Sequence, residues 1–261
     1  MKKLSGKNAF ISGSSRGIGL ACAKAIAEQG ANVFLVATNE VLLKEVTSAI
    51  QQRSAVQVGF HAVDLRTLEG CQQASHAFLE RFGQADILVN SAGATKGGIF
   101  PEQSDEEMID GFALKFHGAV RLCRQLWPSL KQSNGTVINI VGGAARSPSG
   151  DFMVGGSVNA ALANFSKALA AQGLVDDVNV NWVLPGMTET ERMERLLEGK
   201  AKMQNKSKDE VRADSIRNEG IRRLGLPEDV AELVVFLCSP AARHIQGAGI
   251  PVDGGAGKGY Y

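Results

Sequence analysis

The stretch that decides the fold is Asn8-Ala9-Phe10-Ile11-Ser12-Gly13-Ser14-Ser15-Arg16-Gly17-Ile18-Gly19. Its apolar residues 9–11 predict a short buried strand, and residues 20–28 continue with helical periodicity. Glycines at such a junction let backbone N–H groups approach a ligand and direct a helix N-terminus at it, which favours an anion, most often a pyrophosphate. Their spacing differs from the common G-x-G-x-x-G motif, so a tight structural turn is the alternative. The position at the first strand–helix junction favours the anion site.

Length, charge and cysteine usage limit the kind of protein this can be. A chain of 261 residues can form one α/β domain, and a formal net charge of +1 gives no reason to expect nucleic acid or an anionic membrane as partner. The charged N-terminus lacks a following apolar segment, and no run is long enough to span a bilayer, so we expect neither a signal peptide nor a membrane anchor. The four cysteines are scattered without C-x-x-C or metal-ligand spacing, which favours reduced core thiols in a cytoplasmic protein. His61, His76 and His244 also show no ligand spacing, so no metal site is expected.

Apolar strand-like runs alternate with helical segments along the chain. Strands are predicted at 9–11, 32–37, 56–63, 86–90, 136–141 and 178–184, and helices at 20–28, 40–53, 68–82, 104–130 and 157–172, with a bend near Trp127-Pro128. Apolar strands that alternate with helices predict a parallel sheet covered on both faces. The expected fold is therefore α/β, a doubly wound, Rossmann-type parallel sheet in a three-layer α/β/α single domain over residues 1–261. Ligands are expected beyond the carboxyl ends of its strands.

The segment at about residues 188–224 departs from this alternation because it is rich in charged residues. One interpretation is a solvated helical insertion. The other is a helical lid over a substrate, which we favour because the segment leaves directly from the expected edge of the cleft.

Taken together, these segments resemble the short-chain dehydrogenase/reductase family over essentially the whole chain. The turn Ser12-Gly13-x-x-x-Gly17-Ile18-Gly19 is similar to that family's T-G-x-x-x-G-x-G, and Asn90-Ser91-Ala92-Gly93 is similar to its N-N-A-G. Asp64-Leu65 and the run from Val180 to Thr188 match further motifs, as do residues 223–231 and 247–255. The resemblance implies a nicotinamide dinucleotide in the cleft. The residues that it implies as cofactor-binding are Gly13, Ser15, Arg16, Ile18, Gly19, Thr38, Asn39, Asp64, Leu65, Asn90, Ala92, Gly93, Asn159, Pro185, Gly186 and Thr188.

The end of the second strand bears on which cofactor is used. NAD enzymes of this kind usually carry an acidic residue there to accept from the ribose 2′-OH, whereas this chain has Thr38-Asn39. Arg16 in the turn would face a 2′-phosphate, since guanidinium suits phosphate. The sequence favours NADP, and the alternative is that Arg16 is an ordinary surface residue and the enzyme accepts NADP and NAD alike.

The resemblance fails at the catalytic positions. The family works with an Asn, a Ser and a Tyr-x-x-x-Lys, and alignment of the neighbouring motifs places Lys115, Gly142, Gly155 and Asn159 at these four positions in chain order. The only tyrosines are Tyr260 and Tyr261, at the C-terminus, so no shifted tyrosine within the domain replaces the missing one. Other polar residues near these positions, among them Ser147, Asp151 and His117, are expected to be ordinary loop or helix-surface groups.

Two interpretations of these positions stay open. In the first, the two residues are swapped: Lys115 stands where the family has its Asn, and Asn159 stands where it has its Lys. An ammonium then remains near the reacting oxygen, and desolvation lowers the Lys115 pKa. The two glycines would then leave room for a bulkier substrate or for water. In the second, the site is retired and Lys115 extends to solvent.

Three functions follow from these alternatives. The first is an oxidoreductase that transfers a hydride between NADP(H) or NAD(H) and a carbonyl or alcohol of a small molecule. The second is a catalytically inactive dinucleotide-binding protein that acts as a sensor or oligomeric scaffold. The third is a non-redox lyase or isomerase that retains the cofactor. The resemblance also implies a homodimer or homotetramer packed through the helices at 104–130 and 157–172, and the tail at 257–261 is either disordered or reaches a neighbouring subunit.

Overall fold

Seven parallel strands form one sheet in the computed structural model, which describes residues 2–257. The strands are β1 (Asn8–Ser12), β2 (Asn32–Ala37), β3 (Val58–Ala62), β4 (Ile87–Asn90), β5 (Thr136–Ile140), β6 (Asn179–Pro185) and β7 (Gly249–Val252). Their order in the sheet is β3-β2-β1-β4-β5-β6-β7, and every described pairing is parallel. The predicted doubly wound α/β/α sheet is therefore confirmed.

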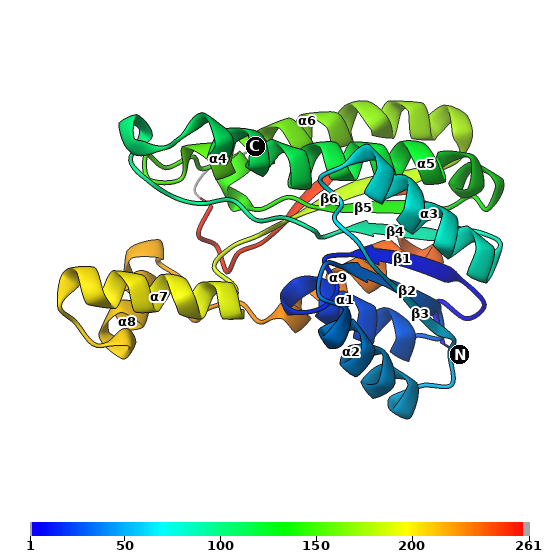
Figure 1. Ribbon diagram of the computed structural model, residues 1–261, viewed down its shortest axis with the longest axis horizontal. Coiled ribbons are helices and arrows are strands. Elements are labelled where there is room, and N and C mark those ends of the chain that lie inside the picture. The colour runs from blue at the N-terminus through cyan, green and yellow to red at the C-terminus, as the bar shows by residue number, and fades with distance from the viewer. Residues whose placement is uncertain (1, 258–261) are drawn as a thin grey trace.

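Helices cover both faces of this sheet. The helices are α1 (Gly17–Glu28), α2 (Glu40–Arg53), α3 (Leu68–Phe82), α4 (Asp105–Gly111), α5 (Gly118–Gln132), α6 (Met153–Asp176), α7 (Glu191–Gln204), α8 (Lys208–Glu219) and α9 (Pro227–Leu237). Figure 1 shows α3, α5 and α6 on one face and α1, α2 and α9 on the other. No helix within residues 2–257 has both the length and the apolar character needed to cross a bilayer.

The two largest hydrophobic cores lie on opposite faces of the sheet. Ile11, Ile26 and Val234 belong to the core on the α1, α2 and α9 side, whereas Phe10, Phe78 and Leu126 belong to the core under α3 and α5. Neighbouring strand residues point to opposite faces, so Phe10 and Ile11 lie in different cores. Both faces of the central strands are thus buried, which explains why these strands are apolar throughout.

The predicted helix at 104–130 differs from the structure. α4 begins at Asp105 after the N-cap Ser104, but residues Phe112–His117 form a π-helical segment before α5 begins. Pro128 lies inside α5, which continues to Gln132, so the bend expected near Trp127-Pro128 stays a prediction, whereas the π segment was not expected. π segments of this length are rare and frequently occur at functional sites.

Several element ends also differ from the predictions. α6 begins at Met153 and ends at Asp176, beyond both ends of the predicted 157–172 helix, because Val154 and Gly156 at its start are buried by packing despite the low helix propensity of glycine. β3 is shorter than the predicted 56–63 strand. Of the predicted tail, residues 258–261 lie outside the described residues.

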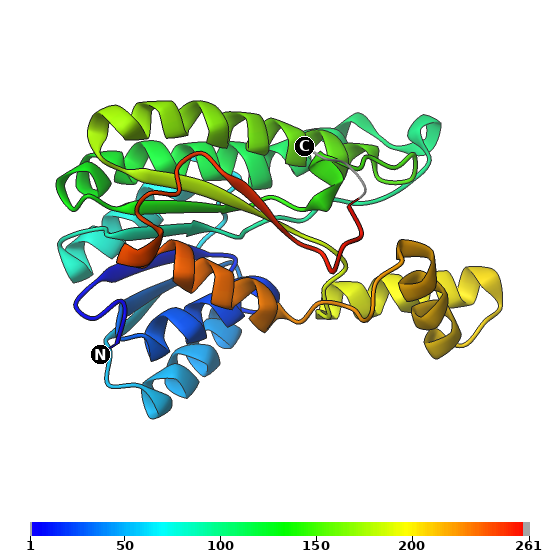
Figure 2. The ribbon, with the colours of Figure 1, turned by 180° about the vertical axis from the view of Figure 1, so that it is seen from behind.

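The charged segment at 188–224 forms α7 and α8 with a small core of their own. Leu197, Val211 and Leu224 are buried in this cluster. Figures 1 and 2 show both helices projecting beyond the end of the sheet, away from the helices that cover its faces. A parallel bridge between Thr188 and Gly225 joins the beginning and the end of the segment.

Candidate functional site

The residues that the sequence singled out meet where the order of the strands reverses. β1 pairs with β2 on one side and with β4 on the other, and Ser12 at the end of β1 lies beside Asn90 at the end of β4. Successive connections leave this point in opposite directions, which opens a crevice at the carboxyl ends of the strands. The glycine turn after β1 and residues 91–93 after β4 form its two sides.

The glycine turn is packed so closely that side chains are excluded. Gly13 has a φ of +66°, and a Cβ there would lie 2.8 Å from the Ala92 Cα. A Cβ on Gly19 would lie 2.3 Å from the Gly13 carbonyl oxygen. The N-cap residue of α1, Arg16, makes no side-chain capping bond, and the first turn contains no acidic residue. The N-terminal N–H groups of α1 are therefore available to an anion.

Two serines that the sequence analysis did not select hold this turn in place. Ser12 Oγ accepts from the backbone N–H groups of Ser91 (3.0 Å) and Ala92 (3.1 Å), which ties the turn to the segment after β4. The buried Ser14 Oγ donates to the Ile11 carbonyl and accepts from the Val36 N–H, both at 2.9 Å. The sequence pointed to Ser15 instead, because neighbouring serines in a turn give no signal of which one turns inward.

In the predicted 2′-phosphate region, two nearby carboxylates each pair with a cation. Arg16 Nη1 lies 3.2 Å from Glu191 Oε2 at the start of α7, with both side chains exposed. Glu40, directly after Asn39, pairs with Lys44 at 2.7 Å. Asn39 Oδ1 caps α2 by accepting from the Leu42 N–H at 3.0 Å, so this side chain keeps only its amide N–H groups for a ligand.

The adenine side of the expected site is formed by the segment after β3. Asp64 accepts from the Arg66 N–H at 2.9 Å and pairs with the Arg66 guanidinium at 3.2 Å, which fixes the carboxylate near the end of its strand. Leu65 is buried, and its carbonyl would lie 3.0 Å from a Cβ on Gly118. The backbone around Asp64 is therefore held between β3 and α5.

Asn90 faces the interior of the sheet instead of the cleft. Its Nδ2 donates to Asn139 Oδ1 at 2.8 Å, and Asn139 Nδ2 donates to Ser166 Oγ at 2.7 Å. This buried polar chain runs from β4 through β5 to α6 and was missed by the sequence analysis, because Asn139 lies inside an otherwise apolar strand. Buried hydrogen bonds of this kind fix the relative position of the elements they join, although Asn90 Oδ1 accepts no hydrogen bond from residues 2–257.

The segment after β6 closes the cleft on its other side. Gly186 donates its N–H to the Val252 carbonyl at 3.0 Å, and a Cβ there would lie 2.9 Å from the Asp253 Cα. Thr188 is buried, and its Oγ1 donates to the Gly186 carbonyl at 3.1 Å. Pro185, Gly186 and Thr188 thus belong to one rigid turn between β6 and α7.

Lys115 and Asn159 approach the same short segment after β5. The partly buried Lys115 lies in the π segment, and its Nζ donates to the Val141 carbonyl. A Cβ on Gly142 would lie 3.3 Å from Asn159 Nδ2, and the buried Asn159 Oδ1 accepts no hydrogen bond from residues 2–257. The Lys115 ammonium is therefore directed into the site and does not extend to solvent.

The surroundings of Lys115 favour its neutral form. Burial is the larger cause and the nearby Arg192 guanidinium the smaller, and together they lower the pKa of Lys115 from its usual 10.5 to about 7. A lysine with a pKa near neutrality exchanges a proton readily at physiological pH. The Gly93 backbone lies against its stem, since a Cβ there would be 3.0 Å from Lys115 Cδ.

The space beside Gly155 is not open, contrary to the expectation from sequence. A Cβ at Gly155 would lie 2.0 Å from the Phe152 ring, so the aromatic side chain from one turn earlier fills the place of a side chain at 155. The Phe152 ring also lies 5.8 Å from the Arg192 guanidinium carbon. The expectation of extra room failed because a sequence position does not reveal which neighbouring side chain turns into the gap.

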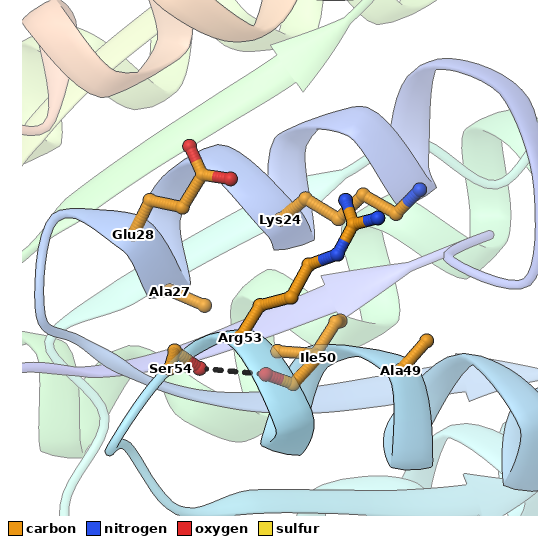
Figure 3. Close-up of a pocket in the computed structure, with 7 residues that line it drawn as sticks. All are labelled: Lys24, Ala27, Glu28, Ala49, Ile50, Arg53 and Ser54. Carbon is orange, nitrogen blue, oxygen red and sulfur yellow. Dashed lines mark hydrogen bonds between the residues drawn. The ribbon is translucent and has the colours of Figure 1, made fainter.

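Two hollows on the surface border α1, and the lining of one of them includes Gly17 of the glycine turn. One, of about 100 Å³, lies between α1 and α2 (Figure 3) and is lined by Lys24, Ala27, Glu28, Ala49, Ile50, Arg53 and Ser54. Its one drawn hydrogen bond joins Ser54 Oγ to the Ile50 carbonyl of the same helix, at 2.9 Å. Another, of about 200 Å³, lies between α1 and the start of α7. Within the described chain, no group of three or more His, Cys, Asp or Glu side chains is arranged to hold a metal ion.

Comparison with known proteins identifies the class to which this fold and cleft belong. A family model described as enoyl-(acyl carrier protein) reductase matches residues 13–257. The uncharacterized oxidoreductase YvaG of Bacillus subtilis is 33% identical over 258 residues, which cover 97% of this chain and 96% of the relative. The chain belongs to the short-chain dehydrogenase/reductase family.

Two further relatives show what such proteins do. The 3-oxoacyl-[acyl-carrier-protein] reductase FabG of Chlamydia trachomatis is 28% identical over 252 residues, covering 95% of this chain and 96% of that protein. The crystal structure of L-sorbose reductase from Gluconobacter frateurii, complexed with NADPH and L-sorbose, matches with a TM-score of 0.95 and 34% identity, covering 99% of this chain and 100% of that one. Both are named as reductases.

Proposed function

We propose that this protein is an oxidoreductase that reduces a carbonyl group of a small molecule with NADPH, using Lys115 as the proton donor. The observation that carries the proposal is the side-chain-free glycine turn at the N-terminus of α1, which faces the segment holding Lys115 across the reversal of strand order. The similarity to an NADPH-bound reductase at 34% identity supports the same cofactor class.

The residues present suit a dinucleotide. Gly13, Gly17 and Gly19 keep the turn free of side chains, and the uncapped α1 N-terminus offers N–H groups to a pyrophosphate. The backbone around Asp64 and Leu65 would hold the adenine end, and Ala92, Gly93 and Thr188 would hold the nicotinamide end. Asn159 would donate to a ribose hydroxyl. When bound, the cofactor supplies a hydride to the carbonyl carbon.

The protein's own contribution is the proton and the geometry. Lys115 reaches the cleft from the π segment, and in its ammonium form it would donate a proton to the carbonyl oxygen as charge develops there. No tyrosine lies within residues 2–257, and glycines occupy 142 and 155, so we propose that Lys115 and Asn159 replace the family's usual proton-transfer residues. The helices α7 and α8 would act as the lid. We also propose a homodimer or homotetramer, which the exposed Leu174 and Val175 on α6 support.

The test of this function is NADPH oxidation by the purified protein against a panel of ketones and aldehydes, followed from pH 6 to pH 9. Because the Lys115 pKa is lowered to about 7 and the ammonium form is the donor, kcat for reduction should fall as pH rises above about 7. The reverse reaction needs the neutral amine and should speed up over the same range. NADPH binding without turnover on any substrate would instead support the inactive dinucleotide-binding alternative.

Arg16 should decide between NADPH and NADH. Removing its guanidinium by Arg16→Ala should weaken NADPH binding about tenfold and leave NADH binding within about twofold, because only NADPH carries the 2′-phosphate. Glu191→Gln frees Arg16 from its exposed ion pair, which is worth at most about 1 kcal/mol, so NADPH affinity should rise by a few fold.

Fluorescence titration with each reduced cofactor measures both effects. Arg53→Ala is the matched control, because Arg53 is an exposed arginine at the end of α2, outside the cleft. Equal losses of NADPH and NADH affinity in Arg16→Ala would contradict the 2′-phosphate role.

A further inference from the structure

The acidic residues at and just before the start of α7 are already paired with cations other than Arg192. Glu191 pairs with Arg16 at 3.2 Å, Glu194 pairs with Lys208 at 2.8 Å and with Arg212, and Glu189 pairs with Arg212 at 2.8 Å. Arg192 lies among these residues, yet it forms no salt bridge with any carboxylate of residues 2–257. Its charge is therefore not used by the chain's own acidic groups.

Arg192 is nevertheless held in a defined position. Its Nη2 donates to the Thr95 carbonyl at 2.7 Å and approaches Thr95 Oγ1 at 3.4 Å, while its guanidinium lies over the Phe152 ring. Both hydrogen bonds within the described chain use Nη2, so Nε and Nη1 have no acceptor there. A guanidinium held beside a ring with free donor groups is suited to a carboxylate.

The segment after β4 places Arg192 and Lys115 along one wall. Gly93 lies against the Lys115 stem, Thr95 accepts from Arg192, and Gly97 lies near Phe152, since a Cβ there would be 3.7 Å from the ring. Gly93, Thr95 and Gly97 therefore lie next to Lys115, Arg192 and Phe152, respectively. Arg192 is close enough to Lys115 to contribute to its lowered pKa. Lys115 also has no carboxylate partner in residues 2–257.

We propose that the substrate is an oxo acid whose carboxylate binds Arg192 while its carbonyl oxygen faces Lys115. The inference rests on the proposed function and adds the substrate class. In the reduction, the carbonyl carbon gains a C–H bond by accepting the hydride from NADPH, which leaves as NADP⁺. The C=O π pair takes a proton from the Lys115 ammonium, giving a hydroxy acid, and the resulting amine regains a proton from water.

Binding of matched probes tests this directly. Phenylpyruvate and acetoacetate, each beside its methyl ester, are titrated against NADP⁺-loaded protein by ligand-observed NMR, and their reduction is followed with NADPH. Each acid should bind at least about tenfold more tightly than its ester, and Arg192→Gln should remove most of that preference. Lys202→Gln, which removes an exposed cation almost three turns further along α7, should leave the preference within about twofold.

The other outcomes overturn the inference in distinguishable ways. Esters that bind or react as well as the acids, a preference that survives Arg192→Gln, or no binding of any probe would each exclude the oxo acid. Weaker NADPH binding in Arg192→Gln with an unchanged acid preference would assign Arg192 to the cofactor's phosphates. In all these cases the proposed function stands as long as the wild-type protein binds and oxidises NADPH, whereas failure to bind NADPH counts against the function itself.

Discussion

Lys115→Met should lower kcat about 10²–10⁴-fold and leave NADPH affinity within about threefold, because a positioned general acid contributes that much and the cofactor turn lies on the other side of the cleft. The methionine keeps most of the stem that packs against Gly93 but removes the group that hydrogen-bonds the Val141 carbonyl. Steady-state kinetics and cofactor titration on the same preparation measure the two effects.

The same substitution should raise stability while it removes activity. Desolvation lowers the Lys115 pKa to about 7, whereas an unfolded lysine titrates near ~10.4, so the unfolded state binds more protons between these values. Lys115 therefore does not destabilise the folded protein above about pH 10, and it lowers the free energy of unfolding increasingly as pH falls to about 7. Lys115→Met lacks that loss and should be about 1–2 kcal/mol more stable at pH 7, with the advantage shrinking by pH 9.

Chemical denaturation at the two pH values checks the stability change. Lys200→Met serves as the matched control, since Lys200 is exposed on α7 and should change neither kcat nor stability appreciably. Full activity of Lys115→Met would exclude Lys115 as the proton donor. Asn159→Ala tests the second proposed residue separately from Lys115, because this change should weaken NADPH binding as well as turnover.

Gly13→Ala and Gly19→Ala should each abolish measurable NADPH binding and lower the free energy of unfolding by about 2–4 kcal/mol. At Gly13 the added methyl meets the Ala92 backbone at 2.8 Å and the residue must keep a φ of +66°. At Gly19 it meets the Gly13 carbonyl oxygen at 2.3 Å, so the turn and the start of α1 must move apart. Either shift displaces the N–H groups that would hold the pyrophosphate.

Gly199→Ala is the control with the opposite sign. Gly199 lies within α7, and a Cβ there would have no heavy atom within 4 Å, so alanine should stabilise the protein by about 0.5–1 kcal/mol through its higher helix propensity. Thermal unfolding and NADPH titration of the three variants distinguish close packing at the turn from a general effect of replacing glycine. A fully stable Gly19→Ala that binds NADPH would contradict the tight packing of the turn.

Sequence patterns predicted the fold well because the fold depends on periodicity. Alternating apolar strands and amphipathic helices appear directly in the order of residues, and β2, α2 and α3 match the predicted ranges 32–37, 40–53 and 68–82. The π segment at Phe112–His117 was not predicted, because π segments are rare and no residue type in this stretch distinguishes i→i+5 from i→i+4 hydrogen bonding. The start of α6 at Met153 was missed for a related reason, since its glycines lower helix propensity while burial stabilises the turn.

What the sequence by itself determined is the α/β architecture and the glycine turn between β1 and α1, whereas the placement of Lys115 and Asn159 at the family's catalytic positions stays a prediction. Only the tertiary structure decided that Ser14 turns inward, that Phe152 fills the space beside Gly155, and that Arg192 from α7 lies on the wall that holds Lys115. The physical reason is the separation along the chain between the residues that interact. Turns and periodic elements follow from neighbouring residues, whereas the charge and shape of a cleft depend on contacts between residues such as Thr95 and Arg192, which are 97 positions apart in the chain.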